Sequence, residues 1–162
     1  MTQRFYEDVV VEGHLIDSQI VSKMMDDIIE LGGEFEMLSF EVGRTNDDVS
    51  RAVLRVIAAD QPTLDNVVTA VLEHGAVPVD PSDVEWGAAP VEGVFPERFY
   101  STTNMETWVR LNGGWVRIPG AEMDLGVRVD PVARTAELVP INDVRAGDLF
   151  VVGHKGLRIV PV

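Results

Sequence analysis

The feature that most limits the fold is a pair of amphipathic segments set among short β-rich runs in residues 1–80. In the first segment Ile20, Met24 and Ile28 recur every four residues, which is the spacing of one buried helix face. The second apolar stripe is formed by Leu64, Val67, Val68, Val71 and Leu72. Strands are predicted at 9–11, 34–42, 51–58 and 77–79. This order predicts an α+β fold with an ACT- or ferredoxin-like βαββαβ layer in residues 1–80.

Residues with specific capping preferences mark the ends of both predicted helices. Asp17 or Ser18 can cap the first helix, because a side-chain oxygen there accepts from the unpaired N–H groups of the first turn. The pair Gly32-Gly33 ends that helix, since glycine adopts the left-handed conformation readily. The run Asp60-Gln61-Pro62 begins the second helix and Gly75 ends it.

The predicted strand at residues 34–42 contains one break in its alternation. Phe35 and Met37 lie in one phase, and the apolar residues from Leu38 onward lie in the other. A β-bulge would account for the slip, and so would a strand that is buried on both faces.

The second half of the chain carries strand and turn signals only. Residues 81–97 are rich in proline and glycine, which predicts a linker without regular structure. Residues 98–162 predict a small all-β barrel, because short strands recur between glycine-containing turns. The expected strands are at 108–111, 115–118, 125–129, 135–139, 149–152 and 157–160.

The charge balance limits the partners. The 162 residues include 13 Lys and Arg against 27 Asp and Glu, which gives a net charge of −14. Such a surface repels nucleic-acid backbones and anionic membranes, so neither is expected as a partner. The same field attracts cationic ligands such as basic amino acids, although keeping the chain soluble is a sufficient reason for it.

The chain has no cysteine, which excludes disulfides, thiolate nucleophiles and Cys-based zinc sites. The N-terminus has no apolar signal core, and no apolar run approaches the length of a membrane span. A cytoplasmic location is therefore expected.

Two groups of polar residues are candidates for ligand binding. His14 and Asp17 follow the first strand, where they could bind an ammonium group, but capping is the better-supported interpretation for Asp17. The run Ser101-Thr102-Thr103-Asn104 offers hydroxyls and an amide to an amino acid or a phosphate, and the same residue types also shape loops.

Glu122 and Asp124 would share one face of a strand, which suits a cation, although a solvated surface is the favoured interpretation. The three histidines, His14, His74 and His154, are not arranged in a metal-binding spacing, so no metal site is expected.

Two stretches resemble known families. The elements Gly13-His14-Leu15-Ile16-Asp17 and Gly32-Gly33-Glu34-Phe35 resemble the conserved region of the bifunctional lysine-oxoglutarate reductase/saccharopine dehydrogenase (LOR/SDH). The stretch from Phe99 to the end includes Ser101-Thr102-Thr103-Asn104 and Gly153-His154-Lys155-Gly156. It resembles the N-terminal part of archaeal-type ornithine cyclodeaminases and the middle segment of cyanobacterial arginine dihydrolases.

The resemblance implies a role in ornithine, arginine or lysine metabolism beside an NAD-dependent catalytic part. This sequence contains no Gly-x-Gly-x-x-Gly fingerprint, so no cofactor is expected in the chain itself. No complete active site is recognisable, and whether the chain is part of an enzyme stays open.

Three hypotheses follow. In the leading one, the chain is a non-catalytic module that assembles with or regulates an NAD-dependent enzyme, with a basic amino acid as a candidate ligand. It would form a homo-oligomer, since ACT-like layers often pair edge to edge. In the second, it is the substrate-binding subunit of an ornithine cyclodeaminase-type lyase. In the third, it is a structural spacer.

Overall fold

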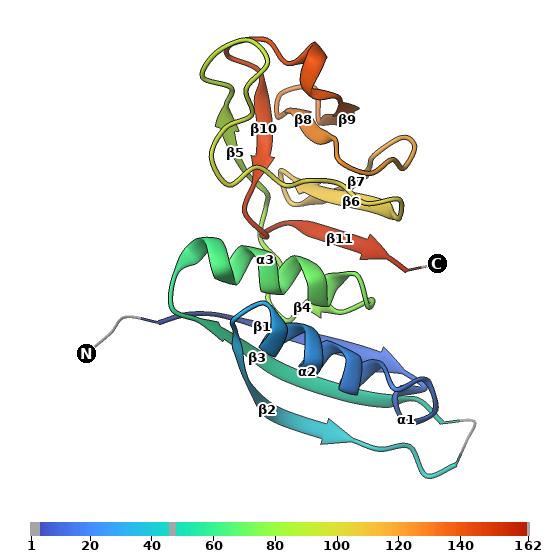
Figure 1. Cartoon of the computed structure of the whole chain (residues 1–162). Coiled ribbons are helices and arrows are strands. Elements are labelled where there is room, and N and C mark those ends of the chain that lie inside the picture. The colour runs from blue at the N-terminus through green and yellow to red at the C-terminus, as the bar shows by residue number, and fades with distance from the viewer. Residues whose placement is uncertain (1–3, 46–47, 162) are drawn as a thin grey trace. The chain divides into compact units, whose positions relative to one another are not determined.

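The computed structural model describes residues 4–45 and 48–161, apart from the side chains of residues 16 and 17. The chain divides into two compact units, Met1–Pro81 (unit 1) and Ser82–Val162 (unit 2) (Figure 1). In the described part of the chain, no helix combines the length and the apolar character needed to cross a membrane.

Unit 1 follows the predicted βαββαβ order with one additional helical turn. Its elements are β1 (Phe5–Gly13), α1 (Leu15–Ser18), α2 (Ile20–Glu30), β2 (Glu34–Glu41), β3 (Ser50–Ala58), α3 (Gln61–Leu72) and β4 (Val77–Pro78). The four strands form one antiparallel sheet in the order β2-β3-β1-β4. This confirms a mixed fold of helices and antiparallel sheet, whereas the ACT-like assignment stays a prediction.

The two longer helices cover the same side of this sheet (Figure 1). The strand β3 alternates buried and partly exposed residues along its whole length, as a strand with one covered face does. Val9 and Leu54 on that face are fully buried, together with Met24 of α2 and Val68 of α3. The predicted stripe of α3 is therefore buried throughout, and Met24 and Ile28 of the predicted stripe of α2 are buried while Ile20 is partly exposed.

The predicted irregularity in β2 is a β-bulge. The register of β2 against β3 shifts between Met37 and Ser39, so Leu38 is the extra residue. Leu38 is 41% exposed. The change of apolar phase in the sequence falls at the residue where the strand changes register.

The predicted cap of the first helix is wrong, and that of the second is confirmed. The helix α2 begins after Gln19, which is left-handed and makes no side-chain capping bond. Ser18 instead donates its hydroxyl and its N–H to the carbonyl oxygen of His14, at 2.7 and 3.1 Å, which closes the separate turn α1. At the start of α3, Asp60 accepts a hydrogen bond from the N–H of Thr63 at 2.8 Å.

Unit 2 forms two open sheets. Its elements are β5 (Glu85–Ala88), β6 (Glu106–Leu111), β7 (Gly114–Arg117), β8 (Gly126–Asp130), β9 (Thr135–Val139), the 3₁₀ helix η1 (Ile141–Asp143), β10 (Leu149–Val152) and β11 (Leu157–Val160). One sheet has the order β5-β10-β8-β9 and the other β11-β6-β7. The six predicted strands are all present, and the hairpin turn of β6 and β7 has positive φ at Asn112 and Gly113, as predicted.

The predicted closed barrel is wrong for the strands that the structure describes. The consecutive strands β10 and β11 pair with different sheets, because the turn between them redirects the chain. Gly153 and Gly156 both have positive φ in this turn. The expectation that residues 81–97 lack regular structure is also wrong, since they contain β5, which pairs with β10.

Candidate functional site

Thr102 holds the predicted loop Ser101–Asn104 in place. Its side chain is buried, and its Oγ1 donates to the carbonyl oxygen of Glu122 at 2.6 Å and accepts from the N–H of Leu125 at 3.0 Å. Its backbone N–H donates to the carbonyl oxygen of Leu125, and its own carbonyl accepts from the N–H of Asp124. The Thr102 hydroxyl thus joins two loops and uses both its donor and an acceptor position for this purpose.

These hydrogen bonds bring the Ser101–Asn104 loop beside Glu122 and Asp124. Ser101, Asn104, Glu122 and Asp124 are exposed, and Thr103 accepts a hydrogen bond from the N–H of Met105 at 3.1 Å. Glu122 and Asp124 lie in a turn before β8, so the idea that they share a strand face is wrong. Asp124 has a φ of 63°, which a β-strand does not allow.

The other predicted pair lies in unit 1. His14 links β1 to α1, and its carbonyl oxygen accepts both hydrogen bonds from Ser18. Asp17 lies in the four-residue helix α1, and its side chain is outside the described residues. The remaining histidines are His74, which contacts Asp27, and His154, which is buried in unit 2. Among the side chains that the structure describes, no three metal-binding groups gather.

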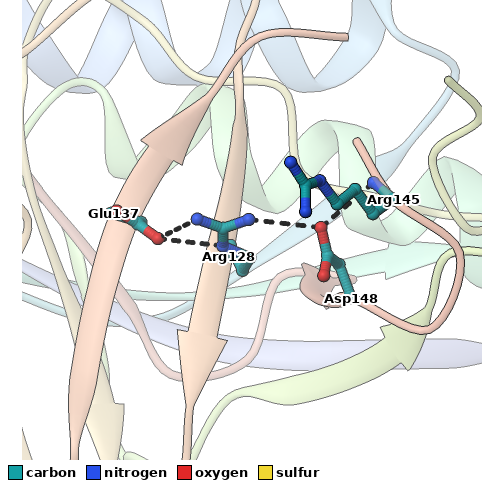
Figure 2. Close-up of polar contacts among 4 residues, drawn as sticks. All are labelled: Arg128, Glu137, Arg145 and Asp148. Carbon is teal, nitrogen blue, oxygen red and sulfur yellow. Dashed lines mark hydrogen bonds and ion pairs between the residues drawn. The ribbon is translucent and has the colours of Figure 1, made fainter. Parts of the chain in front are cut away.

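The structure assembles a charged cluster that the sequence analysis missed (Figure 2). Arg128 of β8 lies opposite Glu137 of β9, and its Nε and Nη2 both contact Oε1 of Glu137, the former at 2.9 Å. Its Nη1 lies 3.2 Å from Oδ2 of Asp148, which also accepts from the backbone N–H of Arg145. Arg128 therefore bridges two carboxylates across the sheet.

The electrostatics of this cluster keep the guanidinium charged. The hydrogen bond with Glu137 is the largest cause that raises the pKa of Arg128, desolvation opposes it, and the bond with Asp148 adds to it. Arg128 thereby neutralises part of the negative charge on the two carboxylates.

A surface pocket of about 330 Å³ adjoins the Arg128 cluster. It is lined by Arg128, Val129, Asp130, Pro131, Thr135, Glu137, Gly147, Asp148 and Leu149. Three carboxylates against one guanidinium give the lining a net charge of 1 − 3 = −2. The volume lies at the lower end of the range for small-molecule sites. This pocket, called the Arg128 pocket below, therefore has a net negative lining, in which Arg128 already pairs with two of the three carboxylates.

Part of this cluster could have been found in the sequence. The predicted hairpin around Asp130-Pro131 places Arg128 close to Glu137 in register, and opposite charges facing each other across a strand pair are a recognisable signal. Asp148 joins them only through the pairing of β10 with β8, which no local pattern indicates.

Two family descriptions match the chain. "LOR/SDH bifunctional enzyme conserved region" matches residues 6–105, and "Arginine dihydrolase ArgZ-like, C-terminal, first region" matches residues 106–162. The first covers more than half of the chain. The chain belongs to the LOR/SDH conserved-region family.

Relatives and solved structures agree with this assignment. The chain is 43% identical to an ornithine cyclodeaminase of Methanopyrus kandleri, over 99% of the chain and 39% of the relative. It is 32% identical to the bifunctional arginine dihydrolase/ornithine cyclodeaminase ArgZ of Synechocystis, over 93% of the chain and 22% of the relative.

Crystal structures of two such proteins share the fold. Apo ArgZ, a cyanobacterial arginine dihydrolase, matches with a TM-score of 0.93 and 30% identity over 99% of this chain and 25% of that protein. The ternary complex of AgrE with ornithine and NAD⁺ matches with a TM-score of 0.91 and 27% identity over 100% of this chain and 24% of AgrE. The chain thus spans less than two fifths of the length of these relatives.

Proposed function

We propose that this chain is a non-catalytic module that assembles with or regulates an NAD-dependent enzyme acting on ornithine or a related basic amino acid. The observation that carries the proposal is the match of almost the whole chain to about a quarter of ArgZ, at a TM-score of 0.93. A catalytic part with its NAD site would then be supplied by another domain or chain. Unit 1 would be an ACT-like layer, and the location would be cytoplasmic.

The geometry of the predicted loop supports a non-catalytic role. The Thr102 hydroxyl is committed to Glu122 and Leu125, and that of Thr103 accepts from the backbone of Met105. Groups held in this way shape a surface. Catalysis would instead need a side chain that can exchange a proton or bind a reacting atom.

Complementation tests this proposal. The NAD-dependent remainder of the Methanopyrus kandleri ornithine cyclodeaminase, without the region that this chain matches, would be mixed with the chain, and ornithine consumption would be followed. We expect the mixture to consume ornithine and each part alone to be inactive. If the two parts neither associate nor gain activity together, the assembly role is excluded.

A second candidate function is substrate binding across an interface, as in a subunit of an ornithine cyclodeaminase-type lyase. The Arg128 pocket favours it, because its net negative charge suits the ammonium group of a basic amino acid. The Ser101–Asn104 loop with Glu122 and Asp124 is the alternative surface. If that loop binds the substrate, a Thr103→Ala/Asn104→Ala variant should lose turnover in the complemented enzyme while keeping its fold. If the chain is only a structural spacer, the variant should leave turnover unchanged.

Thermal unfolding tests which ligand binds the chain and whether it binds in the Arg128 pocket. The chain would be heated with ornithine, arginine, lysine, saccharopine or proline, each with and without NAD. A ligand present at about a hundred times its Kd stabilises the fold by about 2.7 kcal/mol. If the Arg128 pocket binds it, Glu137→Gln should abolish the shift and Glu122→Gln, a matched change outside the pocket, should not. A shift that survives Glu137→Gln excludes the pocket.

A further inference from the structure

The sheet of unit 1 has a second face that neither of its two longer helices covers (Figure 1). The residues that alternate with the buried ones point to it, and several are apolar and at least partly exposed: Tyr6, Val10, Val53, Ile57, Val77 and Val79. Tyr6 is 58% exposed and Val79 is 49% exposed. We call this surface the open face.

The register of β1 against β3 orders the open face into rows. Asp8 pairs with Arg55, Val10 with Val53, and Glu12 with Arg51. Arg55 donates to both oxygens of Asp8, at 2.8 and 3.1 Å. On these two strands the carboxylates of the open face lie on β1 and the guanidiniums on β3, at matching heights along the strands.

On β1 and β3 such an arrangement is complementary to itself. The strand β2 adds the carboxylates of Glu34, Glu36 and Glu41 to the same face, opposite Ile57, Arg55 and Arg51. A two-fold axis that runs along the strands, midway between β1 and β3, places β1 of one copy over β3 of the other at the same height. Asp8 and Glu12 then face arginines, and Val10 faces Val53. An axis across the strands would instead bring Arg51 against Arg55. The charge pattern therefore selects one orientation.

We propose that a second copy of this chain packs face to face on the open face, with its strands nearly aligned, as in the packing of two sheets. The proposal is independent of the proposed function.

The two edge strands of the sheet are poorly suited to the edge-to-edge pairing expected from the sequence, which favours a dimer through the open face. The edge strand β2 carries Glu34, Glu36 and Glu41 and is interrupted by the bulge at Leu38, all of which hinder strand addition. The opposite edge, β4, has two residues. Neither edge offers a long, regular strand to a second copy.

Sedimentation equilibrium tests the proposal. We expect the wild-type chain to have twice the mass of one chain, and Val10→Lys to have the mass of one chain with an unchanged circular dichroism spectrum. The matched control is Ile29→Lys, which changes an exposed residue on the helical side of the sheet and should leave the dimer intact. A wild-type chain that is monomeric at its solubility limit overturns the proposal, as does a dimer that survives Val10→Lys.

Charge reversal tests the complementarity itself. An acidic variant, Arg51→Glu/Arg55→Glu, and a basic variant, Asp8→Lys/Glu12→Lys, should each be monomeric alone and should form a dimer when mixed. Self-association of either variant, or no association on mixing, overturns the proposed charge pairing.

Cross-linking fixes the orientation and does not depend on the other variants. Because the chain has no cysteine, Glu12→Cys supplies one thiol per copy. With the axis along the strands the two thiols lie at the same height, and a short bismaleimide should join them. Ile29→Cys should give no cross-linked dimer. Equal yields from the two variants, or no yield from Glu12→Cys, contradict the proposed orientation.

Discussion

The imidazole Nε2 of His74 lies 2.6 Å from Oδ2 of Asp27, so the turn that follows α3 is joined to the last turn of α2. Both side chains are partly exposed. Next to this pair lies Glu73, whose pKa is raised, chiefly by burial, while His74 lowers it and Asp27 raises it. The contact between the two helices therefore contains a carboxylate that is less favourable in its charged form.

Replacing Glu73 by glutamine should stabilise the fold at neutral pH. A carboxyl with a raised pKa binds its proton more tightly in the folded state, so stability falls as pH rises from the ordinary value of 4.5 through the raised value. Glu73→Gln removes this loss. We expect a gain of a fraction of a kcal/mol, because solvent screens a partly exposed group.

The measurement is the midpoint of thermal unfolding against pH. The gain should be present at neutral pH and should disappear below pH 4.5. Glu30→Gln, on the exposed side of α2, is the control and should change little. A gain that persists at acid pH would show that the charge of Glu73 is not the cause, since glutamate and glutamine have nearly the same size.

The cap of α3 should produce the opposite pH dependence. The hydrogen bond from Thr63 is the largest cause that lowers the pKa of Asp60. Its stabilising contribution is therefore complete above the ordinary value of 3.8 and is lost as pH falls through the lowered value. We expect Asp60→Asn to keep the cap at every pH and Asp60→Ala to lower the unfolding temperature at neutral pH. Equal unfolding temperatures for the wild type and Asp60→Ala at neutral pH would contradict a stabilising cap.

Features determined by neighbouring residues were predictable from the sequence. Asp60 caps α3 because its side chain reaches an N–H three residues on, and Gly75 ends the turn after α3 with a φ of 92°. The bulge at Leu38 appeared as a change in apolar phase. At the start of α2 the same reasoning failed, because Gln19 adopts a left-handed conformation that no local residue pattern indicates.

Features that depend on distant strands were not predictable. Residues 85–88 form a strand only because β10 pairs with them, and their glycine and nearby prolines indicated a linker. A barrel and two open sheets have the same local pattern, and the partners of β10 and β11 distinguish them. For the same reason, the hydrogen bond between Thr102 and Leu125 could not be predicted from the sequence, which indicated only a polar loop.

The turn between β10 and β11 should tolerate no side chain at Gly156. Its φ is 72°, and a Cβ there would lie 2.3 Å from the backbone nitrogen of Val84. Backbone atoms cannot move aside as a flexible side chain can, so we expect Gly156→Ala to cost at least about 2 kcal/mol. Gly113→Ala is the matched control, because its φ is 77° and its Cβ would meet no atom within 4 Å. Urea unfolding compares the two, and similar losses would show that φ alone matters.

The Arg128 cluster should depend more on Asp148 than on Glu137. The side chain of Asp148 is 22% exposed against 58% for Glu137, and its Oδ2 also accepts from the N–H of Arg145. We expect Asp148→Ala to cost about 1 to 2 kcal/mol because it leaves a turn N–H without its acceptor, and Glu137→Ala about 0.5 kcal/mol as an exposed pair. Urea unfolding of both variants, with and without Arg128→Ala, measures the difference. If Asp148 acts mainly through the turn, its loss should persist when Arg128 is also removed. A loss that vanishes with Arg128 would assign the effect to the ion pair instead.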